Sequence, residues 1–219
     1  MAFSDYKNMS QVQKEFAIKY EEENFIISQD IEPPPAFLNE FRFNVETIDV
    51  YTSEASRAEG IIFPILREVY KNYHEQFSFW IQKPFIYNDK LSGTPDYLIA
   101  TKSALGKTVL EAPLVMVAEA KKNDFEQGWG QCLAELVAAQ KISGDAGFAV
   151  QGIVTDGKLW EFGKLAGNTF VKNIEGFTVD HLAKLFGVLN FVFQSVGKFA
   201  QRSTTIRKWK QFTSARILL

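Results

Sequence analysis

The chain has 219 residues, a net charge of −2 and one cysteine, Cys132. Its 46% hydrophobic and 23% charged residues are typical of one globular domain with a full core, not of a disordered chain. One cysteine excludes an intrachain disulfide framework, and together with only two histidines it argues against a zinc site. No apolar run approaches the roughly twenty residues of a transmembrane helix, and the acidic N-terminal stretch is not a signal peptide. We therefore expect a cytoplasmic protein that does not enter a membrane.

Residues 1–35 are predicted to form a helical extension, which ends at Pro33–Pro35 because consecutive prolines are incompatible with a helix. The extension is too short for a core of its own, so we expect it to pack against or partly cover the core over residues 36–175. Residues 176–219 should complete this single domain as a C-terminal helix and a basic tail.

Residues 36–73 are predicted to be helical. Thr52 or Ser53 can cap a helix that starts near Glu54. Apolar residues then recur at helical spacing and predict a buried face: Ala58, Ile61, Ile62, Ile65, Leu66 and Val69. Glu54 and Glu59 lie on or beside this face, where a carboxylate needs a partner. The alternative is a charge that merely favours the positive end of the helix dipole.

Two strands are predicted to bring charged side chains together. Residues 77–87 alternate and read as a strand, turns follow at 88–90 and 92–95, and Asp96 then begins a short apolar run. The unbroken apolar run 114–118 is typical of a strand buried on both faces. Glu119 and Lys121 follow it and share one face, because alternate residues of a strand point the same way. If the two runs pair as an antiparallel hairpin, Asp96 joins them at one end of the sheet.

Two carboxylates and an ammonium in one place indicate a metal-dependent chemistry. Neighbouring carboxylates repel, and their burial is costly without a counter-charge. Mg²⁺ removes this repulsion and is commonly held by one or two carboxylates, waters and a substrate phosphate. The lysine can then orient a water or stabilise charge that grows on the phosphate. The alternative is a surface hairpin with a solvated Glu–Lys pair.

Residues 125–142 are predicted to form a helix that Asn123–Asp124 can cap. Gly128 and Gly130 are poor helix formers, so they indicate close packing or the close approach of a ligand. Gln131 should point to the same end of the sheet as Lys121, with Gln127 as a weaker candidate. The alternative is that both amides face solvent.

The rest of the chain is predicted to be structural up to its end. Strands are expected at 148–155, 158–164 and, as an edge, 170–174, with Asp156 in a turn and not on a metal. A last helix should start at Thr178 or Asp180 and run to about Val196. No acidic residue follows Lys198, and basic and aromatic residues alternate there, among them Arg207, Lys208, Trp209, Lys210 and Phe212. Arg207, Lys208 and Lys210 are candidates to grip phosphates. The alternative is a solvated helix or a subunit contact.

At Pro95–Asp96 and Glu119–Ala120–Lys121 the chain resembles the PD-(D/E)XK nuclease superfamily. The resemblance covers roughly residues 53–162. The predicted order of helix, three strands, helix and strand agrees with the αβββαβ core of restriction-endonuclease-like proteins, an α/β fold with a central mixed sheet flanked by helices.

The resemblance implies a deoxyribonuclease that uses Mg²⁺, or Mn²⁺ in its place. Asp96 and Glu119 would hold the metal, with the carbonyl of Ala120 as a third ligand, and Lys121 would position the attacking water. The superfamily often takes a further glutamate from the first core helix, here Glu54, with Glu59 as second choice. Its exonuclease branch has a glutamine followed four residues later by tyrosine. Gln131 matches that glutamine, but Glu135 stands in place of the tyrosine.

Two other functions are compatible with parts of the sequence. A nuclease-fold protein could bind nucleic acid or a protein partner without cutting, and it would do so without metal and without Lys121. An α/β enzyme acting on a small phosphorylated ligand lacks support, because the chain has no G-x-x-x-x-G-K-[ST] loop. A homodimer would suit the cutting of both strands of a duplex.

Overall fold

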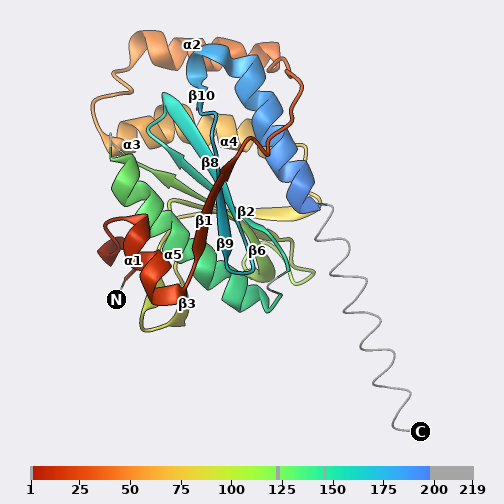
Figure 1. The fold of residues 1–219 in the computed structure, drawn as a ribbon. Helices are drawn as coiled ribbons and strands as arrows, with labels where there is room; N and C mark the ends of the chain where they lie inside the picture. The colour runs from red at the N-terminus through yellow and green to blue at the C-terminus, as the bar shows by residue number, and fades with distance from the viewer. Residues whose placement is uncertain (1, 122–123, 146, 198–219) are drawn as a thin grey trace, which may run out of the picture.

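The computed structural model describes residues 2–121, 124–145 and 147–197. Its centre is a mixed sheet that has eight strands in this part of the chain (Figure 1). The sheet order is β1 (Lys19–Glu23), β9 (Thr169–Asn173), β8 (Leu159–Ala166), β7 (Val150–Thr155), β6 (Glu111–Ala120), β5 (Tyr97–Thr101) and β2 (Phe77–Ile81), with β10 (Phe177–Thr178) paired to β8. The predicted α/β class with a central mixed sheet is confirmed.

Strand β6 lies in the middle of this sheet and is buried from Pro113 to Ala120, as its apolar run predicts. It pairs antiparallel with β5 and parallel with β7. A parallel pair needs a crossover connection, and helix α5 (Phe125–Ser143) supplies it. Asp124 caps α5 by accepting a hydrogen bond from the main-chain nitrogen of Gln127 at 2.9 Å, and Gly144 ends the helix in a left-handed conformation.

Helices cover both faces of the sheet (Figure 1). One face carries α5 together with the short turn η1 (Phe3–Asp5) and α1 (Met9–Phe16). The other face carries the remaining helical segments: α2 (Pro35–Thr47), α3 (Glu54–Arg57), the π-helical turn η2 (Ala58–Ile62), α4 (Phe63–Tyr70), η3 (Val179–His181) and helical residues 182–197. No helix in the described part of the chain is long and apolar enough to cross a membrane.

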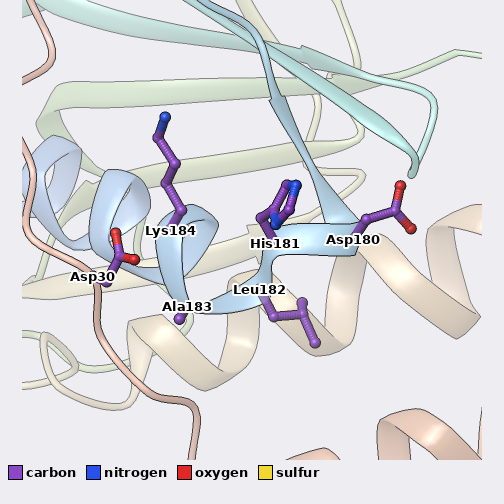
Figure 2. Close-up of a pocket in the computed structure, with 6 residues that line it drawn as sticks. All are labelled: Asp30, Asp180, His181, Leu182, Ala183 and Lys184. Carbon is purple, nitrogen blue, oxygen red and sulfur yellow. The ribbon is translucent and has the colours of Figure 1, made fainter.

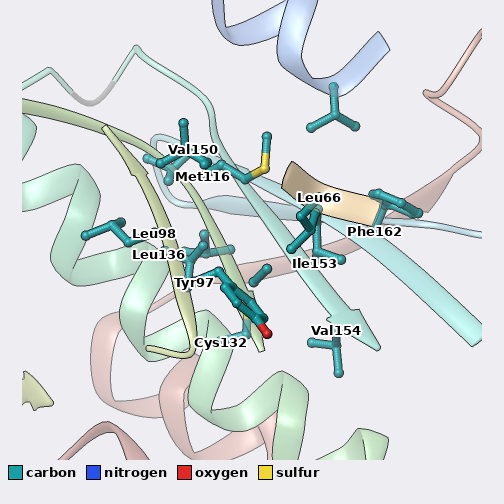
Figure 3. Close-up of a cluster of buried hydrophobic side chains, with 14 of the residues drawn as sticks. Leu66, Tyr97, Leu98, Met116, Cys132, Leu136, Val150, Ile153, Val154 and Phe162 are labelled. Atoms are coloured by element: carbon teal, nitrogen blue, oxygen red, sulfur yellow. The ribbon is translucent and has the colours of Figure 1, made fainter. Parts of the chain in front are cut away.

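The core is built from both helical layers and the strands between them. Figure 3 shows Leu66 of α4, Leu136 of α5, Tyr97 of β5 and Ile153 of β7 within one cluster. All four side chains are almost completely excluded from solvent. The strands that carry the charged residues are therefore fixed from both sides.

The N-terminal extension is only partly helical. Helix α1 ends at Ala17, which has a left-handed conformation, and residues 19–23 form strand β1 in place of the expected helix. Strand β1 pairs in parallel with β9, so β9 is not the edge that the sequence predicts. Glutamates favour helix, but pairing with β9, which is distant in the sequence, overrides that local preference. The extension does pack on the domain, since Phe3, Tyr6 and Val12 are buried in the same core.

Two further predicted elements are divided in the structure. The expected helix over 36–73 forms as separate segments, and Ser53 caps the second by accepting a hydrogen bond from Ser56. The expected strand over 77–87 breaks at Gln82, whose φ is 45°. After this break β3 (Phe85–Asn88) and β4 (Leu91–Gly93) form a separate hairpin, so residues 92–93 lie in a strand and not in a turn.

Candidate active site

The ends of β5 and β6 bring Asp96 and Glu119 together. Tyr97 pairs with Ala118 in the antiparallel ladder, so the residues that flank this pair are neighbours. The main-chain nitrogen of Ala120 donates to Asp96 Oδ2 at 2.8 Å, and that of Asp96 donates to Glu119 Oε1 at 3.3 Å. The predicted juxtaposition of the two carboxylates is confirmed.

Lys121 completes this group just beyond the end of β6. Its main-chain nitrogen donates to the carbonyl of Thr155 at 2.8 Å, which continues the pairing of β6 with β7. Its ammonium lies 3.3 Å from Glu119 Oε2. The side chain of Glu119 is fully buried, whereas that of Lys121 is 16% exposed. Both side chains are therefore mostly buried, and a solvated surface pair is excluded.

Gln131 reaches the same carboxylate from α5. Its Nε2 donates to Glu119 Oε2 at 2.7 Å and to Glu135 Oε1 at 3.2 Å. The side chain is buried, so the alternative of a solvent-facing amide is wrong for Gln131. We call Asp96, Glu119, Lys121, Gln131 and Glu135 the carboxylate cluster.

The two glycines of α5 allow close packing. A Cβ atom on Gly128 would lie 2.7 Å from Val154 Cγ1 and 3.0 Å from Lys121 Cγ. On Gly130 it would lie 2.6 Å from the main-chain nitrogen of Asn8. Gly128 thus leaves room for the side chain of Lys121, and Gly130 leaves room for the N-terminal extension.

Burial governs the ionisation of the carboxylate cluster. The pKa of Glu119 is raised to about 7, because burial and the charge of Asp96 raise it more than Lys121 lowers it. Burial also raises the pKa of Asp96, against the stabilising main-chain donor of Ala120 and the charge of Lys121. The pKa of Glu135 lies well above its ordinary value, because the residue is buried beside Glu119. The carboxylates of this cluster are therefore short of positive charge.

Lys121 remains an ammonium in these surroundings. Burial alone would lower its pKa, but the nearby carboxylates of Glu119, Asp96 and Glu54 outweigh that effect and raise it. A cationic lysine beside buried carboxylates is suited to holding a water or a phosphate oxygen.

The structure distinguishes Glu54 from Glu59, although both are exposed. Glu54 is the first residue of α3, and its charge contributes to the raised pKa of both Asp96 and Lys121. Glu59 instead acts on Tyr97, whose pKa is raised by burial, by Asp96 and by Glu59. Glu54 is thus the glutamate whose charge acts on the carboxylate cluster.

Two buried charged residues have environments that the sequence analysis missed. The side chain of Glu135 in α5 is fully buried. Its spacing of four residues from Gln131 was the sequence signal that could have indicated a contact between the two side chains. Arg57 is also buried, donates to the carbonyl of Asp156 at 2.8 Å and lies 3.6 Å from its carboxylate. Asp156 also accepts hydrogen bonds from Lys158 and Leu159, which confirms its role in the turn.

Among the described residues, a second place that could bind a ligand is a pocket near the start of the last helix. It has a volume of about 330 Å³ and is lined by Asp30, Asp180, His181, Leu182, Ala183 and Lys184. Figure 2 shows Asp30 and Asp180 at opposite ends of it, so their carboxylates do not converge. Within the described residues, no three His, Cys, Asp or Glu side chains form a group that could hold a metal ion.

The donor set of the cluster nevertheless fits Mg²⁺. This ion is usually bound through one or two carboxylates while it keeps several waters, and not by a cage of protein ligands alone. Asp96 and Glu119 supply two carboxylates, and the carbonyl of Ala120 follows directly in the chain. The basic candidates Arg207, Lys208 and Lys210 lie outside the described residues.

A scan of the sequence against models of protein families found no match, and a search of curated proteins found none either.

Proposed function

We propose that this protein is a nuclease of the restriction-endonuclease-like, PD-(D/E)XK type that hydrolyses phosphodiester bonds of DNA with Mg²⁺ or Mn²⁺. The observation that carries the proposal is the contact of Asp96, Glu119 and Lys121 at the end of two central strands. The order of elements supports it, since α3 to α4, β2, β5, β6, α5 and β7 follow the αβββαβ pattern, with the β3–β4 hairpin as an insertion.

The charges of the cluster favour a divalent cation and a phosphodiester as ligands. Asp96 and Glu119 as carboxylates, with Lys121 as the ammonium, carry one net negative charge. One divalent cation and one singly charged phosphodiester together neutralise it. Buried charges are stable only when they are balanced and hydrogen-bonded, so a substrate of this charge suits the site.

Each residue has a role that follows from its position. Asp96 and Glu119 would hold the metal, with the carbonyl of Ala120 as a further ligand, and a bound Mg²⁺ would lower the pKa of a water and screen the phosphate. Lys121, 3.3 Å from Glu119, would orient the attacking water and balance charge on the phosphate. Gln131 orients Glu119, and Glu54 favours binding of the cation from the edge of the site.

DNA and a second copy of the chain are the proposed partners. Phosphate contacts by Lys and Arg supply much of the affinity for DNA, and the tail residues Arg207, Lys208 and Lys210 are candidates for this role. A homodimer would place two such sites on the two strands of a duplex.

The test is cleavage of supercoiled plasmid and of single-stranded DNA with Mg²⁺, Mn²⁺ or EDTA. We expect metal-dependent cleavage by the native chain and a loss of about 100-fold or more in Asp96→Asn and Lys121→Met. Lys141→Ala is the matched control. Lys141 is exposed in the last turn of α5. This turn lies beside Leu114, whose main-chain nitrogen donates to the hydroxyl of Ser143. Leu114 begins the apolar run of β6 and Glu119 follows its end, so Lys141 is distant from the carboxylate cluster.

Two results would contradict the proposal. Cleavage that persists unchanged in Asp96→Asn and Lys121→Met would show that another site or another protein cuts the DNA. No cleavage of either substrate, with DNA bound equally by all variants in EDTA, would favour a nuclease-fold protein that binds nucleic acid without cutting. Circular dichroism would confirm that each variant is folded.

A further inference from the structure

Glu135 is a fully buried carboxyl group that the proposed chemistry does not use. It lies in the middle of α5 beside Cys132 and Leu136, both of which are also fully buried. Burial of a carboxyl group is unfavourable unless it is hydrogen-bonded, and an apolar residue of similar size is often as stable or more stable. Packing alone therefore does not explain a glutamate at this place.

Glu135 is linked to Glu119 through a shared hydrogen-bond donor, the amide of Gln131. Nε2 of Gln131 donates to Glu135 Oε1 and to Glu119 Oε2, so both hydrogens of the amide are directed to carboxyl groups. Burial and the nearby carboxylate of Glu119 also raise the pKa of Glu135. Glu135 Oε2 has no hydrogen-bond partner in the described structure, so the amide of Gln131 is the group that holds this carboxyl.

We propose that Glu135 is a positioning residue that, by holding the amide of Gln131, fixes the orientation in which Glu119 faces Asp96 and the metal. The inference rests on the proposed function, in which Glu119 is a metal ligand. Glu135 acts through Gln131 and Glu119 and is not assigned a contact with the metal or the substrate. Partners that orient metal ligands in this way commonly change metal affinity or activity by about 10–100-fold when they are replaced.

The test uses Mn²⁺ alone as the probe, with its dissociation constant measured by calorimetry, beside DNA cleavage and thermal unfolding. Glu135→Leu should weaken Mn²⁺ binding by about 10–100-fold, lower kcat and leave the unfolding temperature equal to or above that of the native chain. Glu135→Gln should stay within about threefold of the native affinity, because its amide oxygen can still accept from Gln131. Lys141→Ala, at the far end of the same helix, should match the native chain.

A double-variant cycle tests whether Glu135 acts through Gln131. Gln131→Leu should weaken Mn²⁺ binding at least as much as Glu135→Leu. The double variant should bind no more weakly than Gln131→Leu alone, because residues that act as one unit are not additive. Additive losses would contradict a role through Gln131.

The remaining outcomes are also decisive. Native affinity in Glu135→Leu, or a loss in Glu135→Gln equal to that in Glu135→Leu, would overturn the inference. If the native chain binds Mn²⁺ but cuts no DNA, the proposed function fails while the Mn²⁺ affinities still test Glu135. No Mn²⁺ binding by the native chain would overturn both. If Glu135→Leu does not fold, Glu135→Met replaces it, since methionine is flexible and similar in length.

Discussion

The carboxylate of Glu119 is held by residues from three places in the chain. The main chain of Asp96 donates to one oxygen, and Gln131 and Lys121 contact the other. Several donors on one buried carboxylate favour its charged form, yet burial keeps its pKa high, at about 7. A further cation that binds beside Lys121 would therefore stabilise the charged form of these carboxylates.

At the same scale, Glu54 and Glu59 form a matched pair for testing whether an exposed glutamate near the carboxylate cluster assists metal binding. Both are exposed, but the charge of Glu54 acts on Asp96 and Lys121. We expect Glu54→Gln to raise the Mg²⁺ concentration for half-maximal cleavage by roughly 3–10-fold. The negative charge of Glu54 attracts the cation, and salt screens such attraction at longer distances. Glu59→Gln should leave it unchanged. Initial cleavage rates against Mg²⁺ concentration give the answer, and equal effects of the two variants would reject the role of Glu54.

At the scale of one element, α5 connects the cluster to the N-terminal extension. Alanine at Gly128 or Gly130 gains up to about 1 kcal/mol in helix propensity, but each Cβ atom meets a different neighbour. Gly128→Ala should displace Lys121 and lower kcat by about tenfold or more, since small displacements of catalytic groups have large effects on rate.

The comparison for this prediction is Gly130→Ala. Its Cβ atom would strike the main chain of Asn8, so the variant should lose about 1–3 kcal/mol of stability through overpacking and keep a kcat near the native value. Urea unfolding and steady-state kinetics on both variants measure this separation. A native kcat in folded Gly128→Ala would show that Lys121 does not depend on that space.

The sequence predicts those elements whose signals are local. Helix α5 follows its Asp124 cap and ends at Gly144, and the apolar run before Glu119 forms the buried part of β6. The adjacency of Asp96 and Glu119 could also be predicted, because one hairpin joins their strands. The break at Gln82 could not, since a left-handed residue other than glycine or asparagine has no clear local signature.

The features that the sequence does not reveal depend on distant contacts. Strand β1 forms because β9 offers it an edge, although its own residues favour helix. Glu135 is buried because the middle of α5, residues 128–139, is covered by the sheet, the N-terminal extension and the β3–β4 hairpin, which no pattern within the helix indicates. Both are consequences of the tertiary fold and not of local preference.

At the scale of the whole molecule, the cluster makes stability depend on pH. The pKa of Glu119 is about 7 in the folded protein and has its ordinary value of 4.5 when unfolded. The folded state therefore binds more protons between these values, so this contribution is fully present below pH 4.5 and is lost as the pH rises through about 7. Glu135 acts in the same direction. The charged groups that face Glu119 are Asp96 at the start of β5, Lys121 beyond β6, and Glu135 from α5.

We therefore expect the metal-free protein to lose stability, relative to Glu119→Gln, on the order of 1–2 kcal/mol between pH 5.5 and pH 8. Urea unfolding followed by tryptophan fluorescence in EDTA measures this difference, and the reference variant cancels the titration of distant groups. Mg²⁺ should restore stability at pH 8, because a ligand that binds only the folded state adds RT ln(1 + [L]/Kd). It should do less at pH 5.5, where protons compete for the carboxylates, and nothing in Asp96→Asn. If the native chain keeps or gains stability relative to Glu119→Gln as the pH rises in EDTA, Glu119 is not the source of the pH dependence. An equal effect of Mg²⁺ in Asp96→Asn would mean that the carboxylates are not the metal site.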